Sequence, residues 1–276
     1  MRPVLPVAGR AGSSKPTPRS LKSGLKSLLS TRSALDVLDD LARLRVIDLT
    51  QPLHPEIPYW PGAGYGPFRY AQINVFERDG KAAGLFEMPE HMGTHLDAPN
   101  HFVVGATSVD RLNLDQLVRP VVVFDISERA AANSSSLLEI ADVVAWERQH
   151  GRVPRGSVAL VQSGWGSHWA DPAAFRNNAD GVMRFPAVSA SAAGLLVLER
   201  GVVGIGVDTL SADNGEVADS PCHHQVHGAG GFILENLANL EHVPEQGAFV
   251  LIAPLPIVGG SGAPARVLAF CDPEER

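Results

Sequence analysis

The sequence predicts a mixed α/β domain, of the α+β kind rather than a barrel of eight βα units. Apolar runs with strand character and amphipathic helical segments intermingle without regular βαβ alternation. Gly (27 residues) and Pro (21 residues) are frequent, which is typical of a loop-rich, β-containing chain with many turns. The chain has no internal repeat and no second domain boundary, so we expect residues 34–276 to fold as a single domain.

The elements expected in the first half of the chain surround a proline-rich loop. Ser33 is a candidate N-cap for a helix over residues 34–44, where leucines recur at helical spacing. Residues 52–61 must form a loop, because proline has no backbone N–H to donate to a strand ladder. Asp79-Gly80 is a favourable turn dipeptide between two strands. The expected strands are residues 45–50, 68–76, 83–88 and 118–126.

Helices and strands follow one another in the second half of the chain. Residues 135–150 and 189–200 have the apolar spacing of amphipathic helices. Residues 232–240 are expected to form a short helix or helix–turn. The expected strands are the short apolar or β-branched runs 157–162, 202–207, 249–253 and 266–270.

The N-terminal segment differs in composition from the rest of the chain. Residues 1–33 carry only basic charges among Ser, Gly and Pro, and the first acidic residue is Asp36. We expect a flexible basic tail without a part in catalysis. The alternative is a targeting segment, since transit peptides are rich in Arg and Ser and poor in acids.

Charge, hydropathy and cysteine content bear on the partners and the compartment of the protein. The formal net charge of −7 disfavours nucleic acid and membrane surfaces as partners. No run of eighteen apolar residues is present, so we expect no transmembrane helix. The two cysteines, Cys222 and Cys271, do not make a disulfide framework, and this favours a reducing, cytoplasmic location.

One segment concentrates residues that bind metals. His91, His95, Asp97 and His101 are separated by even numbers of residues, so an extended chain would place them on one face. A straight strand would spread the outer pair about 30 Å apart, too far to serve one ion. The chain must therefore bend, most easily at Gly93 and Pro99. Imidazole and carboxylate ligands suit zinc, manganese or iron. The alternative to a metal site is a surface loop that is merely His-rich.

A second polar cluster follows more than one hundred residues later. His223, His224 and His227 lie within five residues, and His223 and His227 would share one face of a helix. Glu235 lies among apolar residues, where a carboxylate is either paired or metal-bound because burying it alone is costly. Taken alone, Glu235 fits an ordinary surface acid as well as it fits a ligand. Taken together with the first cluster, it becomes a candidate metal ligand.

If the two clusters meet, they can support metal-assisted hydrolysis. His91, His95, Asp97, His223 and Glu235 could hold one or two divalent ions. His101 is then left to act as general base and acid toward a leaving nitrogen or oxygen. Trp60 in the proline-rich loop either packs that loop down or lines a pocket for a flat substrate. The chain lacks the Gly-x-Ser-x-Gly elbow of serine hydrolases.

The first cluster resembles the signature of a known family. His91-Met-Gly-Thr-His95-Leu-Asp97-Ala-Pro-Asn-His101 is similar to the His-x-Gly-Thr-His-x-Asp-x-Pro-x-His motif of the cyclase-like metal-dependent hydrolases. This superfamily includes arylformamidase (kynurenine formamidase), isatin hydrolase and certain lactone hydrolases. The resemblance covers about residues 45–271 and includes the twelve-residue spacing from His223 to Glu235, which singles out His223 from the neighbouring histidines.

The resemblance implies a fold, a cofactor and a role for each residue. It implies a swivelling β/β/α domain with a central mixed, barrel-like sheet, flanking helices and a homodimeric or higher assembly. It implies Zn²⁺, one ion or two, with Mn²⁺ as the alternative. His91, His95 and Asp97 would hold the first ion, and His223 and Glu235 the second, with Asp97 and Glu235 shared. His101 would transfer the proton, and Trp60 would line the substrate pocket.

The implied reaction is hydrolysis of a C–N bond in a small aryl formamide or cyclic amide, such as N-formylkynurenine or isatin. Three alternatives stay open at this point: a lactone hydrolase, a ring-closing cyclase of the same family, and a binding module without catalysis. This chain departs from the pattern at Val226-His227, where formamidase-like sequences commonly carry an aliphatic pair. His227 would then add a ligand, alter the second ion site or contact the substrate.

Overall fold

The computed structural model describes residues 33–62 and 64–273, which belong to two compact units, residues 1–42 and 43–276. The expected basic tail lies outside the described residues except for Ser33. In the first unit, helix α2 (Ala34–Leu41) begins at Ser33, whose side chain accepts a hydrogen bond from the Asp36 amide while Asp36 accepts from the Ser33 amide. The expected cap is therefore confirmed, and the helix ends three residues earlier than expected.

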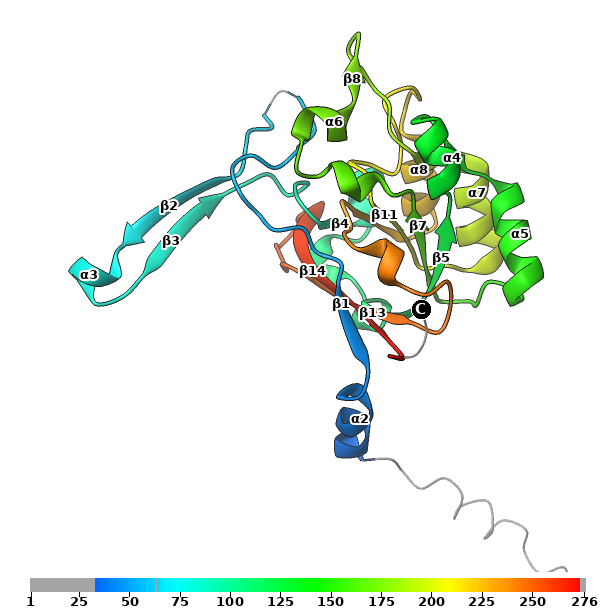
Figure 1. The fold of residues 1–276 in the computed structure, drawn as a ribbon, viewed down its shortest axis with the longest axis horizontal. Coiled ribbons are helices and arrows are strands. Elements are labelled where there is room, and N and C mark those ends of the chain that lie inside the picture. Colours follow the sequence, from blue (N-terminus) through cyan, green and yellow to red (C-terminus); the bar gives the residue numbers. More distant parts are fainter. Residues whose placement is uncertain (1–32, 63, 274–276) are drawn as a thin grey trace, which may run out of the picture. The chain divides into compact units, whose positions relative to one another are not determined.

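The second unit is built on a closed, mixed β-barrel of seven strands (Figure 1). The strand order is β14-β13-β5-β7-β11-β12-β4, and β4 pairs again with β14 to close the ring. This agrees with the barrel-like core implied by the resemblance. The strands are β4 (His95–Asp97), β5 (Val118–Asp125), β7 (Val158–Gln162), β11 (Gly204–Val207), β12 (Phe232–Glu235), β13 (Phe249–Pro254) and β14 (Gly262–Cys271), and β1 (Arg45–Asp48) pairs outside the ring with β14.

Four neighbouring strands, β5, β7, β11 and β12, run parallel. Their side chains are buried on both faces, as expected for parallel strands covered by helices. Val121 and Val123 point into the barrel, whereas Val122 and Phe124 pack outward against the helices. The covering helices are α5 (Ile140–His150), α7 (Ala190–Gly194), which continues as the π-helical turn η5 (Leu195–Arg200), and α8 (Pro221–Gly228).

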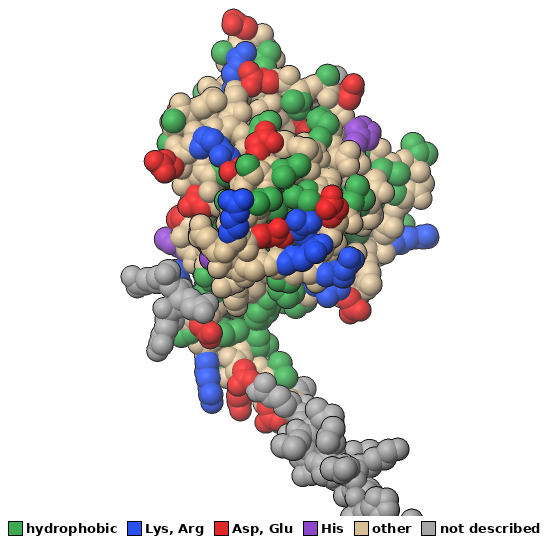
Figure 2. Space-filling view, turned by 90° about the vertical axis from the view of Figure 1, so that its right-hand side faces the viewer, with side chains coloured by type: hydrophobic (Ala, Val, Ile, Leu, Met, Phe, Trp, Pro, Cys, Tyr) green, Lys and Arg blue, Asp and Glu red, His purple; other side chains and the backbone are tan. Residues whose placement is uncertain are grey.

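Charged side chains of both signs are interspersed on the face that carries α5 and α7 (Figure 2). Glu147 on α5 forms an ion pair with Arg200 at 2.7 Å, and Asp142 pairs with Arg129 at 2.7 Å. The Asp142–Arg129 pair is the more exposed of the two, and exposed pairs contribute little to stability individually.

A long hairpin projects from the barrel (Figure 1). The two expected strands are present as β2 (Arg69–Asn74) and β3 (Ala83–Glu87), joined by the helical turn α3 (Phe76–Asp79) and by Gly80 with φ +67°. Several large apolar side chains of this hairpin are exposed, among them Phe76 (67%) and Leu85 (62%). A two-stranded hairpin has no core of its own, so these side chains are available for a contact.

Of the expected helices, the one at residues 232–240 is wrong, and the one at residues 135–150 is wrong in its first residues. Residues 232–240 do not form a helix, because Phe232–Glu235 is strand β12, paired in parallel with β11 and antiparallel with β4. A short apolar run fits a fully buried strand as well as a helix, and the tertiary pairing decides. The helix expected from residue 135 begins only at Ile140, because Leu137–Leu138 pairs as β6 with Ala187–Val188 (β10).

Short elements complete the chain, and some of them contribute to an aromatic core that is separate from the apolar clusters inside and outside the barrel. Phe68, Trp165, Trp169, Phe175 and Phe185 pack together there. No described helix is long and apolar enough to cross a membrane. The short elements are α4 (Ser127–Ala132), α6 (Pro172–Arg176), β8 (Asn178–Ala179), β9 (Val182–Met183) and the 3₁₀ turns η1 (Pro99–His101), η2 (Val109–Arg111), η3 (Leu114–Gln116), η4 (Trp165–His168) and η6 (Leu240–His242).

Candidate metal centre

The barrel brings the two polar clusters of the sequence together. Strand β4 carries His95 and Asp97, and its antiparallel pairing with β12 places Glu235 directly opposite His95. The His-rich segment bends at both expected positions, since Gly93 has φ +64° and Pro99 begins η1. These bends bring His91, which precedes β4, and His101, which follows it, together beside Asp97, since the His91 ring contacts both Asp97 and the His101 ring.

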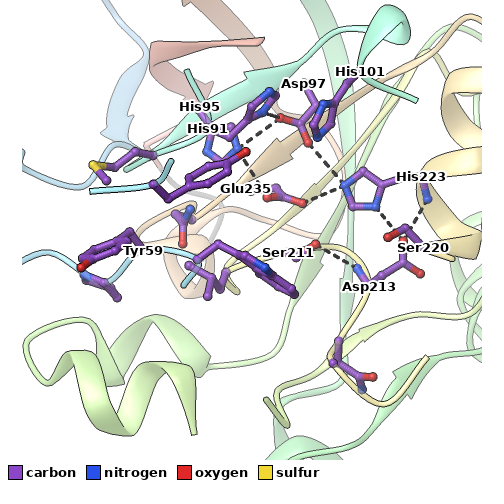
Figure 3. A pocket seen from close by; sticks show the side chains of 18 of the residues that line it. Tyr59, His91, His95, Asp97, His101, Ser211, Asp213, Ser220, His223 and Glu235 are labelled. Atoms are coloured by element: carbon purple, nitrogen blue, oxygen red, sulfur yellow. Dashed lines mark hydrogen bonds and ion pairs between the residues drawn. The ribbon is translucent and has the colours of Figure 1, made fainter. Parts of the chain in front are cut away.

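Three imidazoles converge on two buried carboxylates (Figure 3). His91 Nδ1 lies 2.6 Å from Asp97 Oδ1, and His95 Nε2 lies 3.1 Å from the same oxygen. His223 Nε2 lies 3.4 Å from Asp97 Oδ2 and 3.2 Å from Glu235 Oε1. His95 Nε2 also lies 3.4 Å from Glu235 Oε2. All five side chains proposed as ligands from the sequence therefore meet in one cluster.

The other nitrogen of each imidazole contacts a second polar group. His95 Nδ1 lies 2.8 Å from the Gly93 carbonyl oxygen, which can only accept, so this nitrogen carries a proton. His223 Nδ1 lies 2.6 Å from Asp213 Oδ2, and His91 Nε2 lies 2.9 Å from Ser261 Oγ. Such outer partners fix the ring orientation of metal-binding histidines. Sequence reasoning missed both Asp213 and Ser261, because neither lies in a motif.

Burial and charge act against each other in this cluster. Burial alone would lower the pKa of His95, but Asp97 and Glu235 raise it to about 10. Burial would likewise lower the pKa of His223, and Asp213, Asp97 and Glu235 raise it. Burial and the Asp97 charge would raise the pKa of Glu235, but His223 and His95 lower it to about 2. The pKa of Asp97 is also lowered, because His95, His223 and His91 outweigh its burial.

This donor set fits a divalent cation. Two buried carboxylates require positive charge nearby, and protonated imidazoles supply it in the ion-free protein. A divalent ion would supply the same charge and release those protons, because metals bind neutral imidazole. One potential ligand atom from each of His95, Asp97 and Glu235 lies within 4.8 Å of the other two. Nitrogen and carboxylate donors without thiolate match zinc or manganese.

His101 lies beside this cluster rather than inside it. Its ring stacks on the His91 ring with centroids 3.9 Å apart. Burial lowers the pKa of His101 to about 4; the Asp97 charge opposes this shift and the charges of His91 and His223 reinforce it. The imidazole is therefore neutral at neutral pH and can accept a proton. Ligand atoms of His91, Asp97 and His101 also come within 4.8 Å of one another, which makes His101 a geometrically possible ligand.

Helix α8 separates the three histidines of the second cluster. His223 and His227 share one buried face, with ring centroids 5.6 Å apart, whereas His224 is exposed. Both ring nitrogens of His227 lack a hydrogen-bond partner among the described residues, and burial lowers its pKa to about 3. Cys222 is buried, which raises the pKa of its thiol. It is not joined by a disulfide to Cys271.

A cavity of about 340 Å³ opens onto the cluster. Trp60 lines it, 36% exposed, with its ring edge-to-face against Phe185 at 6.5 Å. Tyr59, Tyr65 and Phe102 add further aromatic wall. Burial and the charges of Asp97, Glu235 and Glu90 raise the pKa of Tyr65, so its hydroxyl stays protonated at neutral pH. The cavity therefore joins an apolar, aromatic wall to a charged floor, as small-molecule sites do.

The chain belongs to a family of hydrolase-related proteins described as putative cyclases, whose sequence model matches residues 47–214. An isatin hydrolase from Roseibium aggregatum is 33% identical over 209 residues, which cover 72% of this chain and 79% of the relative. A kynurenine formamidase from Bacillus cereus is 32% identical over 229 residues, covering 80% and 95% of the two chains.

A solved structure of isatin hydrolase A from Ralstonia solanacearum superposes with a TM-score of 0.83. It is 37% identical to this chain, and the match covers 88% of this chain and 98% of that one. The family resemblance of the His-rich motif is thus confirmed, and the matched segment contains His91, His95, Asp97 and His101.

Proposed function

We propose that this protein is a metal-dependent hydrolase that cleaves the C–N bond of a small cyclic aryl amide such as isatin, or of an aryl formamide such as N-formylkynurenine. The observation that carries the proposal is the convergence of three imidazoles and two carboxylates at the floor of an aromatic-walled cavity. The named relatives, an isatin hydrolase and a kynurenine formamidase, support an amide as substrate.

The proposed cofactor is Zn²⁺, one ion or two, with Mn²⁺ as the alternative. His91, His95 and Asp97 would hold one ion, and His223 and Glu235 would complete a second site that shares Asp97 and Glu235 with the first. When bound, such an ion lowers the pKa of a coordinated water and polarises a carbonyl group.

His101 is the proposed general base and acid. Its neutral ring can take the proton from the attacking water and return it to the leaving nitrogen. Hydrolysis then balances: the hydroxyl group joins the carbonyl carbon, the C–N bond breaks, and the proton ends on the nitrogen. Stacking against His91 limits the positions that the His101 ring can adopt.

The cavity walls suit a flat aromatic substrate. Trp60 and Phe102 present aromatic surface, and aromatic pairs gain about 0.5–1.5 kcal/mol beyond the burial of their area. The protonated Tyr65 hydroxyl can donate a hydrogen bond to a substrate oxygen.

Parallel assays test this function. The purified protein, with its metal content measured, would be supplied with isatin, N-formylkynurenine and an unsaturated lactone. We expect hydrolysis of an amide substrate, its loss after dialysis against a chelator, and its return with Zn²⁺ or Mn²⁺. Turnover that is indifferent to thorough removal of the metal would contradict the proposal, and so would turnover of the lactone alone.

We propose a homodimer as the working assembly, which the hairpin β2–β3 supports. Its exposed Tyr70, Ile73, Phe76, Leu85 and Phe86 place apolar side chains on both faces of an element without a core. A second copy presents the same surface, so a symmetric contact would bury both. A reducing, cytoplasmic location is proposed with it, in keeping with the two buried cysteines.

A further inference from the structure

His91 is held from the side opposite to Asp97 by two residues that belong to no motif. Its Nε2 lies 2.9 Å from Ser261 Oγ, on the loop that precedes the first residues of β14. Ser261 Oγ in turn donates to Glu90 Oε2 at 2.8 Å, and the Ser261 amide donates to the same oxygen at 3.0 Å. Glu90 is thus tied to a residue 171 positions away.

The direction of these hydrogen bonds determines the tautomer of His91. A carboxylate oxygen only accepts, so the single hydroxyl proton of Ser261 points to Glu90. The Ser261 oxygen can therefore only accept from His91, and His91 Nε2 must carry a proton. The nitrogen left to face Asp97 is Nδ1, 2.6 Å from Oδ1.

The backbone around Ser261 fits closely against the imidazole. A Cβ atom at Gly262 would lie 2.5 Å from His91 Cε1, a distance that would force the ring to shift. A Cβ atom at Gly260 would lie 3.0 Å from Glu90 Oε1. On its other face the His91 ring stacks on His101. The ring is thus enclosed between the loop and His101, with Ser261 as its hydrogen-bond partner on Nε2.

We propose that Glu90 and Ser261 are positioning residues that hold His91 as the Nε2–H tautomer and present Nδ1 to the bound ion. The inference rests on the proposed metal-dependent function. Outer-sphere partners of metal-bound histidines typically contribute 10–100-fold to metal affinity. Ser261 and Glu90 therefore set how tightly the ion on the His91 side is held.

The test is zinc affinity, measured on the full chain by competition with a chromophoric chelator. We expect Ser261→Ala and Glu90→Ala each to weaken zinc binding about 10–100-fold. Ser261→Thr keeps the hydroxyl and should recover most of the affinity. Ser108→Ala is the matched control, because Ser108 donates to Asp110, which anchors Gly259 in the same loop without touching His91. Its zinc affinity should equal that of the parent.

A second readout follows the tautomer itself. In ¹⁵N spectra of the zinc-loaded protein, His91 should show a protonated Nε2 that exchanges slowly with solvent, and faster exchange in Ser261→Ala. The inference is overturned if Ser261→Ala binds zinc within twofold of the parent, or if Ser108→Ala weakens binding equally. If the parent itself binds neither Zn²⁺ nor Mn²⁺, the proposed function fails instead, so the two failures are distinct.

Discussion

Asp213 joins His223 to the beginning of helix α8. Its Oδ2 accepts hydrogen bonds from His223 Nδ1 at 2.6 Å and from the His223 amide at 3.0 Å, while Oδ1 accepts from the Cys222 amide at 2.9 Å. One carboxylate thus satisfies two of the free amides at the start of the helix and orients the imidazole that the helix carries. The position of the helix and the orientation of the ring cannot change independently.

Replacing this carboxylate should weaken metal binding. In Asp213→Asn the side-chain NH₂ group would replace one of the two carboxylate oxygens. It would then face either the backbone N–H of Cys222 or the Nδ1–H of His223, and both of these are donors. We expect zinc affinity to fall about 10–100-fold, as for other outer partners of metal ligands. The measurement is a zinc titration, with Asp219→Asn, an exposed acid just before α8, as control. Equal affinity in Asp213→Asn and the parent would contradict the assignment of His223 as a ligand.

Removing the His101 imidazole should separate catalysis from metal binding. General acid–base groups contribute about 10²–10⁴-fold to rate, so His101→Ala should lower kcat by that factor. The metal content should stay at the level of the parent, because the imidazole stacks on His91 beside the carboxylate cluster. Elemental analysis and steady-state kinetics measure the two effects. A variant that has lost metal would make His101 a ligand, which the proximity of His91, Asp97 and His101 also allows.

Much of this site could be predicted from the sequence because its ligands are local in two segments. The spacing from His91 to His101 required a bent chain, and the bends lie at Gly93 and Pro99 as expected. The partners of the ligands could not be predicted. Ser261 reaches His91 only because the barrel closes by pairing β14 with β4, and this pairing depends on the whole chain.

The same limit explains the error at residues 232–240. The apolar run before Glu235 has no alternation, since both faces of β12 are buried, and periodicity then does not distinguish a strand from a helix. The consequence is functional. On a strand, Glu235 lies directly opposite His95, a relationship that a helix would not have provided.

Trp60 should affect binding more than chemistry. It lies in the cavity wall, edge-to-face with Phe185. In Trp60→Ala, the loss of aromatic contact with a flat substrate should raise KM about 10-fold, equivalent to about 1–2 kcal/mol, with kcat changed less. Trp60→Phe should recover part of this loss. Steady-state kinetics decides: unchanged kcat and unchanged KM in Trp60→Ala would place Trp60 outside the substrate pocket.

Polar substitutions on the hairpin should separate the proposed dimer. Phe76→Ser with Leu85→Ser removes two large exposed apolar side chains from an element without a core. We expect the parent to sediment as a dimer and the double variant to dissociate at micromolar concentration, with its thermal unfolding otherwise similar. Glu77→Gln, at an exposed position of the same turn, is the control. A parent that sediments as a monomer would exclude the dimer.

Asp208 should give the stability of the protein a distinct pH dependence. It is buried at the end of β11, and burial raises its pKa to about 6 although hydrogen bonds from the Ser163 hydroxyl and amide oppose the shift. An unfolded aspartate titrates near 4, so between about pH 4 and 6 the folded state binds more protons than the unfolded state. The free energy of unfolding therefore falls as pH rises through this window, by about 2 kcal/mol from this group alone.

The neutral variant Asp208→Asn lacks this contribution, while the other titrating groups are common to both proteins. The free energy of unfolding of the variant minus that of the parent should thus rise by about 2 kcal/mol between pH 4 and pH 7, whatever the sign of the difference at pH 4. Urea unfolding of the metal-free proteins at several pH values measures it. Parallel curves for the two proteins would mean that Asp208 is ionised across the whole range and that the hydrogen bonds from Ser163 outweigh its burial.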